Sequence, residues 1–109
     1  MNVQTEYAQG VLALRLCGEL DHHSAKAVMH AIEQAMDRYL PRRCELDLSG
    51  LTFMDSSGIA VIIRARKRMW ETGGKIWLIR PGAQPLRVLE TSGLERFIQI
   101  KCTESGGVR

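Results

Sequence analysis

One stretch decides the fold of this chain: Leu48-Ser49-Gly50-Leu51-Thr52-Phe53-Met54-Asp55-Ser56-Ser57-Gly58-Ile59. The apolar run at 44–48 predicts a strand, the residues after it predict a short loop, and a helical pattern begins near Ser57. Two serine hydroxyls therefore lie where a strand passes into a helix. The first N–H groups of a helix have no partner within it and carry partial positive charge. An oxygen there caps the helix, and a phosphate on it would be held by the same groups. The spacing alone favours the ordinary cap.

Strand and helix patterns alternate on both sides of this stretch. Strands are predicted at 2–8, 11–17, 44–48, 76–79 and 97–100, and helices at 24–40, at 57–72 and from Pro85 to about residue 92. A short turn joins the first two strands, which predicts an antiparallel hairpin, whereas strands joined through helices are expected to be parallel. The predicted fold class is α/β. It is a small mixed β-sheet in the order β-β-α-β-α-β-α-β, with an antiparallel N-terminal hairpin, the strand at 44–48 in the centre and the helices packed on the sheet.

Three local expectations follow from the same patterns. Residues 19–23 are predicted to form a polar loop, with Ser24 as the cap of the first long helix. Met54 is expected to be exposed beside the serines. One side of the second long helix is predicted to carry the mostly apolar residues Ile59, Ile62, Ile63, Arg66, Met69 and Trp70.

The composition is typical of a single globular domain, predicted to span 1–102 and to be followed by a polar, frayed tail at 103–109. The charged residues, 15 basic and 12 acidic, leave a net charge of +3, which is too small to indicate nucleic-acid binding. No apolar run is long enough for a membrane span, and no signal-peptide pattern is present. Three cysteines without metal-ligand spacing, two of them in strand patterns expected to be buried, favour a reducing compartment. The protein is therefore predicted to be cytoplasmic.

Three motifs together resemble the STAS domain of anti-sigma factor antagonists. They are Gly18-Glu19-Leu20-Asp21-His22-His23, Phe53-Met54-Asp55-Ser56-Ser57-Gly58 and Ser92-Gly93-Leu94. The resemblance extends over essentially the whole chain, in order and with matching element lengths. It implies a STAS-like single domain with no catalytic activity and no cofactor.

The resemblance also implies a function. Family members bind an anti-sigma factor that is also a serine kinase, and so free a sigma factor for sporulation or stress transcription. The kinase phosphorylates the first serine of the motif, which ends tight binding, and a serine phosphatase reverses this. The phosphoacceptor is then Ser56, with Ser57 as the alternative or as the helix cap. The expected partner-binding residues are Asp21, Phe53, Met54, Asp55, Ser56, Ser57, Gly58 and Ile59.

Alternative functions have weaker support in the sequence. A serine hydrolase would use Ser56 or Ser57 with a base such as His22 or His23, but no nucleophile-elbow motif is present. A nucleic-acid site would rest on the basic run Arg64, Arg66, Lys67 and Arg68, which departs from the small residues common in the family. That run lacks interleaved aromatic residues and is typical of a solvated helix face. Adjacent histidines in a loop do not make a metal site.

Overall fold

The structure is a computed structural model, and it describes residues 1–102. The strands are β1 (Asn2–Ala8), β2 (Val11–Leu20), β3 (Arg43–Met54), β4 (Lys75–Ile79) and β5 (Gln99–Lys101). The helices are α1 (Ala25–Tyr39), α2 (Ser56–Glu71), α3 (Ala83–Ser92) and the short 3₁₀ helix η1 (Leu94–Arg96). The predicted tail at 103–109 lies outside the described residues.

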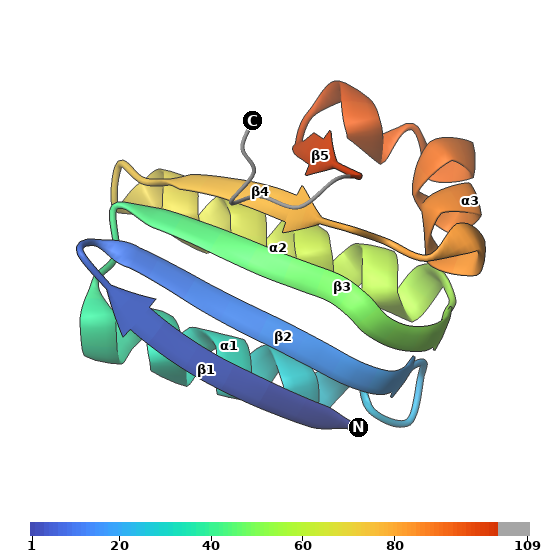
Figure 1. Cartoon of the computed structure of the whole chain (residues 1–109), viewed down its shortest axis with the longest axis horizontal. Helices are drawn as coiled ribbons and strands as arrows, with labels where there is room; N and C mark the ends of the chain where they lie inside the picture. The colour runs from blue at the N-terminus through green and yellow to red at the C-terminus, as the bar shows by residue number, and fades with distance from the viewer. Residues whose placement is uncertain (103–109) are drawn as a thin grey trace.

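The five strands form one mixed sheet in the order β1-β2-β3-β4-β5 (Figure 1). β1 and β2 pair as an antiparallel hairpin, and all other neighbours are parallel. Helices α1 and α2 lie side by side behind the sheet, and α3 lies at the end where β3 passes into α2. The predicted fold class, the hairpin and the central position of the third strand are therefore confirmed.

The core fills the space between the sheet and the two long helices. Alternate residues of β2, namely Leu12, Leu14 and Leu16, are fully buried because every second side chain of a strand points to the same face. Leu46 and Leu48 continue this apolar layer on β3. The helices contribute Val28, Met29, Ile32, Ala35 and Met36 from α1 and Gly58, Val61, Ile62, Ala65 and Met69 from α2.

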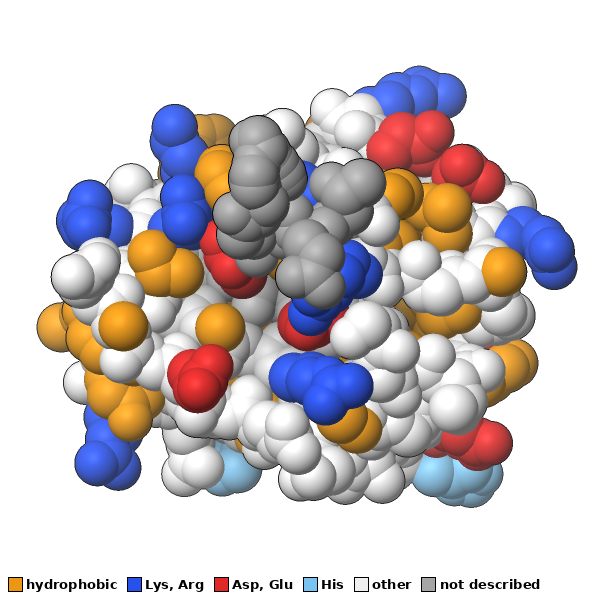
Figure 2. All heavy atoms as spheres, in the orientation of Figure 1, with side chains coloured by type: hydrophobic (Ala, Val, Ile, Leu, Met, Phe, Trp, Pro, Cys, Tyr) orange, Lys and Arg blue, Asp and Glu red, His pale blue; other side chains and the backbone are white. Residues whose placement is uncertain are grey.

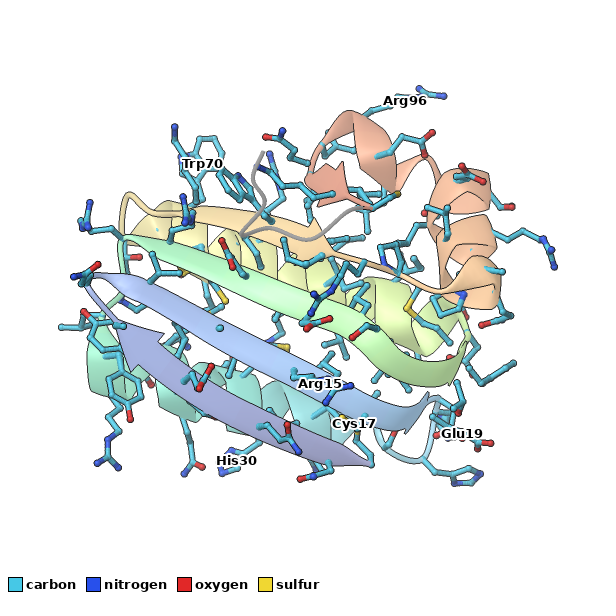
Figure 3. All side chains as sticks on the ribbon, in the orientation of Figure 1. Arg15, Cys17, Glu19, His30, Trp70 and Arg96 are labelled. Atoms are coloured by element: carbon cyan, nitrogen blue, oxygen red, sulfur yellow. The ribbon has the colours of Figure 1, made fainter. Side chains whose placement is uncertain are left out.

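The opposite face of β1, β2 and β3 carries no helix. Basic, acidic and apolar side chains are interspersed there (Figure 2), and Arg15 and Cys17 project from it (Figure 3). Asp47 pairs with Arg80 on this face. Burial alone would raise the pKa of Asp47, but hydrogen bonds from Ser49 and Arg80 hold it below its usual value. The open face therefore has a mixed charge, with at least one acid–base pair on it.

Two strands are longer than predicted, so the first predicted loop begins only at Asp21 and the second is reduced to Asp55. Glu19 and Leu20 belong to β2, and β3 continues through 49–54 without a loop, because the two strands stay paired to the end. A register shift beyond Arg15 keeps the apolar residues on the core side. At Gly50 an added Cβ would lie 2.7 Å from Cys17 Sγ, so a glycine fits this close approach of the strands.

The predicted apolar side of α2 is also partly wrong. Ile63 is 51% exposed and Trp70 is 70% exposed, whereas Gly58 and Ala65 face the core. Small residues let the helix approach the sheet closely, but they give little hydrophobic signal in a sequence. The last strand pattern is shifted as well, since Leu94–Arg96 forms η1 and only 99–101 pairs with β4.

Two simpler expectations can be compared with the structure. The helix predicted at 24–40 is confirmed as α1. Cys44 is buried as predicted, and burial raises the pKa of its thiol to about 12, but Cys17 is only half-buried. Among residues 1–102, no helix combines the length and the apolar character needed to cross a membrane.

Candidate functional site

The two serines lie at the first turn of α2, where Asp55 caps the helix. The Asp55 side chain accepts a hydrogen bond of 2.8 Å from the backbone N–H of Ser57. Ser56 is the first helical residue and is exposed, whereas Ser57 is half-buried. The expectation that Ser57 is the cap is wrong, because its backbone donates to the real cap and its hydroxyl bonds to no described residue. The Ser56 hydroxyl is at the surface and bonds to no residue in the described part of the chain.

Replacing Asp55 by alanine should lower the free energy of unfolding by about 0.5–2 kcal/mol, because the first turn of α2 loses its side-chain acceptor. Asp55→Asn is the matched control, since asparagine caps about as well as aspartate. Urea unfolding of the variants measures the effect. A Ser57→Ala variant should lose much less; an equal loss would mean that the cap is assigned to the wrong residue.

Buried residues pack against the junction where β3 passes into α2. Met54 has no exposed surface, so the expectation that it is exposed beside the serines is wrong. A Cβ on Gly58 would lie 2.4 Å from Met54 Cγ and 3.1 Å from Leu20 Cδ2, so a larger residue would force the buried Met54 side chain to move, whereas glycine lets the helix start close to β3. Met54 and Gly58 therefore shape the surface without presenting side chains to it.

Gln84 fixes the same junction from α3, and nothing in the sequence pointed to it. Its Oε1 accepts from the Met54 backbone N–H, and its Nε2 donates to the Met54 carbonyl, both at 2.8 Å. The side chain replaces a strand partner at the end of β3. Because the two residues are 30 positions apart, only the folded chain shows this contact.

Asp21 organises the turn between β2 and α1. Its Oδ1 accepts from the backbone N–H groups of His23 and Ser24, at 3.0 and 3.1 Å. The bond from the Ser24 backbone is the main reason that the pKa of Asp21 lies below its usual value. Ser24 occupies the predicted N-cap position, but its hydroxyl makes no capping bond and donates to the Glu19 carbonyl at 2.8 Å.

The two turns meet at one edge of the sheet. Leu20 and Met54 are partners in the parallel ladder, and the Asp55 N–H donates to the Leu20 carbonyl at 3.3 Å. Glu19, at the end of β2, marks this edge in Figure 3. The carboxyl ends of neighbouring parallel strands thus bring the Asp21 turn and the start of α2 to the same edge of the sheet. Phe53, the residue before Met54 on β3, has a side chain that is 38% exposed.

The basic run on α2 is largely used within the molecule. Arg64 and Arg68 pair with Glu33 of α1 at 3.1 and 3.5 Å. Arg66 donates to the carbonyl of Phe97 at 3.1 Å. These bonds join α2 to its neighbours, so the run is not a free cationic face.

The geometry gives no support to the hydrolase or metal interpretation. Within residues 1–102, neither Ser56 nor Ser57 has a hydrogen bond from its hydroxyl to a histidine. Within the same residues, no group of three or more His, Cys, Asp or Glu side chains is placed to hold a metal ion.

Comparison with known proteins identifies the family. The model of the STAS domain matches residues 2–106, and the chain therefore belongs to the STAS domain family. A protein of Paenibacillus polymyxa named anti-sigma F factor antagonist is 37% identical over 103 residues, which are 92% of this chain and 86% of the relative.

Two solved structures of SpoIIAA, an anti-sigma factor antagonist, are similar over nearly the whole chain, each at 26% identity. The unphosphorylated form gives a TM-score of 0.79 over 99% of this chain and 100% of the other. The phosphorylated form, from Bacillus, gives 0.71 over 96% and 95%. The resemblance seen in the sequence motifs is confirmed.

Proposed function

We propose that this protein is an anti-sigma factor antagonist that is switched by phosphorylation of Ser56. In its unmodified form it binds an anti-sigma factor that is also a serine kinase, and a sigma factor is freed. A serine phosphatase restores the binding form. The observation that carries the proposal is the exposed Ser56 hydroxyl at the start of α2, at the same edge of the sheet as the Asp21 turn.

Three further points support the proposal. The relatives bear the name of antagonists of anti-sigma factors, and one of them is known in a phosphorylated form. A phosphate at the first turn of a helix is locally tolerated, so the fold should survive the modification. Next to Asp55, and at the same edge of the sheet as Asp21, the phosphate would create a strongly negative surface, which an interface built on a neutral hydroxyl cannot accommodate.

The proposal assigns the chain no catalytic activity, no cofactor and no nucleic-acid or membrane partner, and it places the protein in the cytoplasm. Ser57 is the alternative phosphoacceptor. An antagonist in a stress-response pathway and one in sporulation would use the same surface, so the choice between them rests on the identity of the sigma factor. The genes adjoining this one would identify it.

Binding to the purified anti-sigma factor from the same genome, measured by calorimetry, tests the proposal. Asp21→Ala should weaken that binding at least about tenfold, because a carboxylate on the contact surface is lost. It should also loosen the turn before α1, since Asp21 holds two backbone N–H groups.

Asp21→Asn is the control that separates the two effects, because the amide oxygen keeps an acceptor for the turn but removes the charge. Weak binding by Asp21→Asn with an unchanged melting temperature would support a role at the interface. Unimpaired binding by that variant would limit Asp21 to the turn. No binding by the unaltered protein would reject the proposal.

A further inference from the structure

A stripe of side chains, two of them isoleucines, continues along α2 from the candidate phosphoacceptor. Ser56, Ile59, Ile63 and Arg66 recur at spacings of three and four residues, so they lie on one face of the helix. Ile63 lies seven residues beyond Ser56, or about 10 Å along the axis. This distance is well within one protein–protein interface of standard size, about 800 Å² on each partner.

A slot opens beside this stripe, between α2 and the α3–η1 segment. Its volume is about 270 Å³, and it is lined by Ile59, Ile63, Arg66, Ser92, Leu94 and Phe97. Small-molecule sites usually have volumes of about 300–1,000 Å³, so this slot is better suited to one or two side chains of a protein partner. Arg66 is the one charged residue in its lining.

The exposed apolar surface gathers around the slot. Ile63 is 51% exposed and Phe97 is 64% exposed, and Trp70 follows one turn after Arg66. Trp70 and Arg96 project from the same edge of the molecule in Figure 3. Apolar side chains grouped in this way on a soluble domain mark contact sites more often than scattered ones do.

Phe97 is held in place before any partner arrives. Its N–H donates to the Leu94 carbonyl at 2.9 Å, and its own carbonyl accepts from Arg66 Nε at 3.1 Å. An aromatic ring on a fixed backbone loses little freedom on binding, so its contact area contributes fully to affinity. The remaining N–H groups of Arg66 can receive a carboxylate next to the slot.

We infer that the anti-sigma factor covers this slot as well as the Ser56 surface, and that it inserts a large apolar side chain flanked by an acidic residue. The inference rests on the proposed function and extends its binding surface to Ile63, Arg66 and Phe97. Ile59 connects the two regions, because it follows Ser57 and Gly58 and also lines the slot.

Calorimetry with the anti-sigma factor from the same genome tests the inference. Phe97→Ala and Ile63→Asn should each weaken binding at least about tenfold. Leu40→Asn is the matched control for a lost exposed apolar side chain. Leu40 is 70% exposed just after the end of α1, at the other end of the molecule from the start of α2, and its positive φ of 45° suits asparagine. The Leu40→Asn variant should bind the anti-sigma factor as tightly as the unaltered protein does.

Hydrogen exchange gives a second measurement that does not depend on variants. Amides at 60–66 and 94–98 should exchange more slowly in the complex. Unaltered binding by both slot variants, without that protection, would overturn the inference and leave the proposed function standing. An equal loss in Leu40→Asn would also overturn it. A failure of the unaltered protein to bind would reject the proposed function and the inference with it.

Discussion

Phosphate should appear on Ser56 when the protein is incubated with its anti-sigma kinase and ATP, and it should be absent from Ser56→Ala. The reason is exposure: Ser56 is open to solvent at the helix entrance, whereas Ser57 is half-buried. Mass spectrometry measures the phosphate on the unaltered protein, on Ser56→Ala and on Ser57→Ala. Phosphate that persists on Ser56→Ala but vanishes from Ser57→Ala would reverse the assignment. No phosphate on any of them would reject the switch.

The modified protein should bind the anti-sigma factor at least about a hundredfold more weakly, because like charges placed together in an interface cost several kcal/mol. Ser56→Ala should keep its affinity. Ser56→Asp should lose only part of it, since it adds one charge where a phosphate adds about 1.5 to 2. All forms should melt at nearly the same temperature, because the Ser56 hydroxyl has no bond to a described residue that a substitution could break.

Met54→Ala should lower the free energy of unfolding by about 2–5 kcal/mol, because it opens a cavity beneath the junction of β3 and α2. Met54→Leu, which nearly conserves volume, should lose less than about 1.5 kcal/mol. Guanidinium unfolding with an unchanged denaturant slope measures both. A large loss of binding by Met54→Ala with little loss of stability would instead mean that Met54 faces the partner.

The main features of the fold could be predicted because they depend on local patterns. The alternation of leucine with other residues at 11–17 predicted β2, and the helical spacing of apolar residues at 25–39 predicted α1. The loop predicted between residue 48 and the second long helix was wrong over most of its length, because Ser49, Gly50 and Thr52 are small or polar and interrupt the apolar pattern of the strand. Their strand conformation comes from pairing with β2, which the local sequence does not encode.

The main residues of the site could be predicted, but the contacts that hold them in place could not. The serines and Asp21 stood out through their motifs. Met54 was wrongly placed at the surface because a residue between Phe53 and Asp55 gives no local signal of which side it faces. The Gln84 contact and the bond from Arg66 to Phe97 span 30 and 31 positions, and each exists only once the elements pack.

The firm anchoring of Ser56 has a consequence for timing. Ser56 comes just after β3, whose end is held by Gln84, and it begins α2, which is capped by Asp55. The backbone on both sides of Ser56 is therefore fixed by hydrogen bonds. On the proposed function, the free protein then needs no slow rearrangement when a phosphate is added or removed. The level of active antagonist would then follow the ratio of kinase to phosphatase rates without a lag. The effect of a past signal would last only as long as the phosphate stays on Ser56.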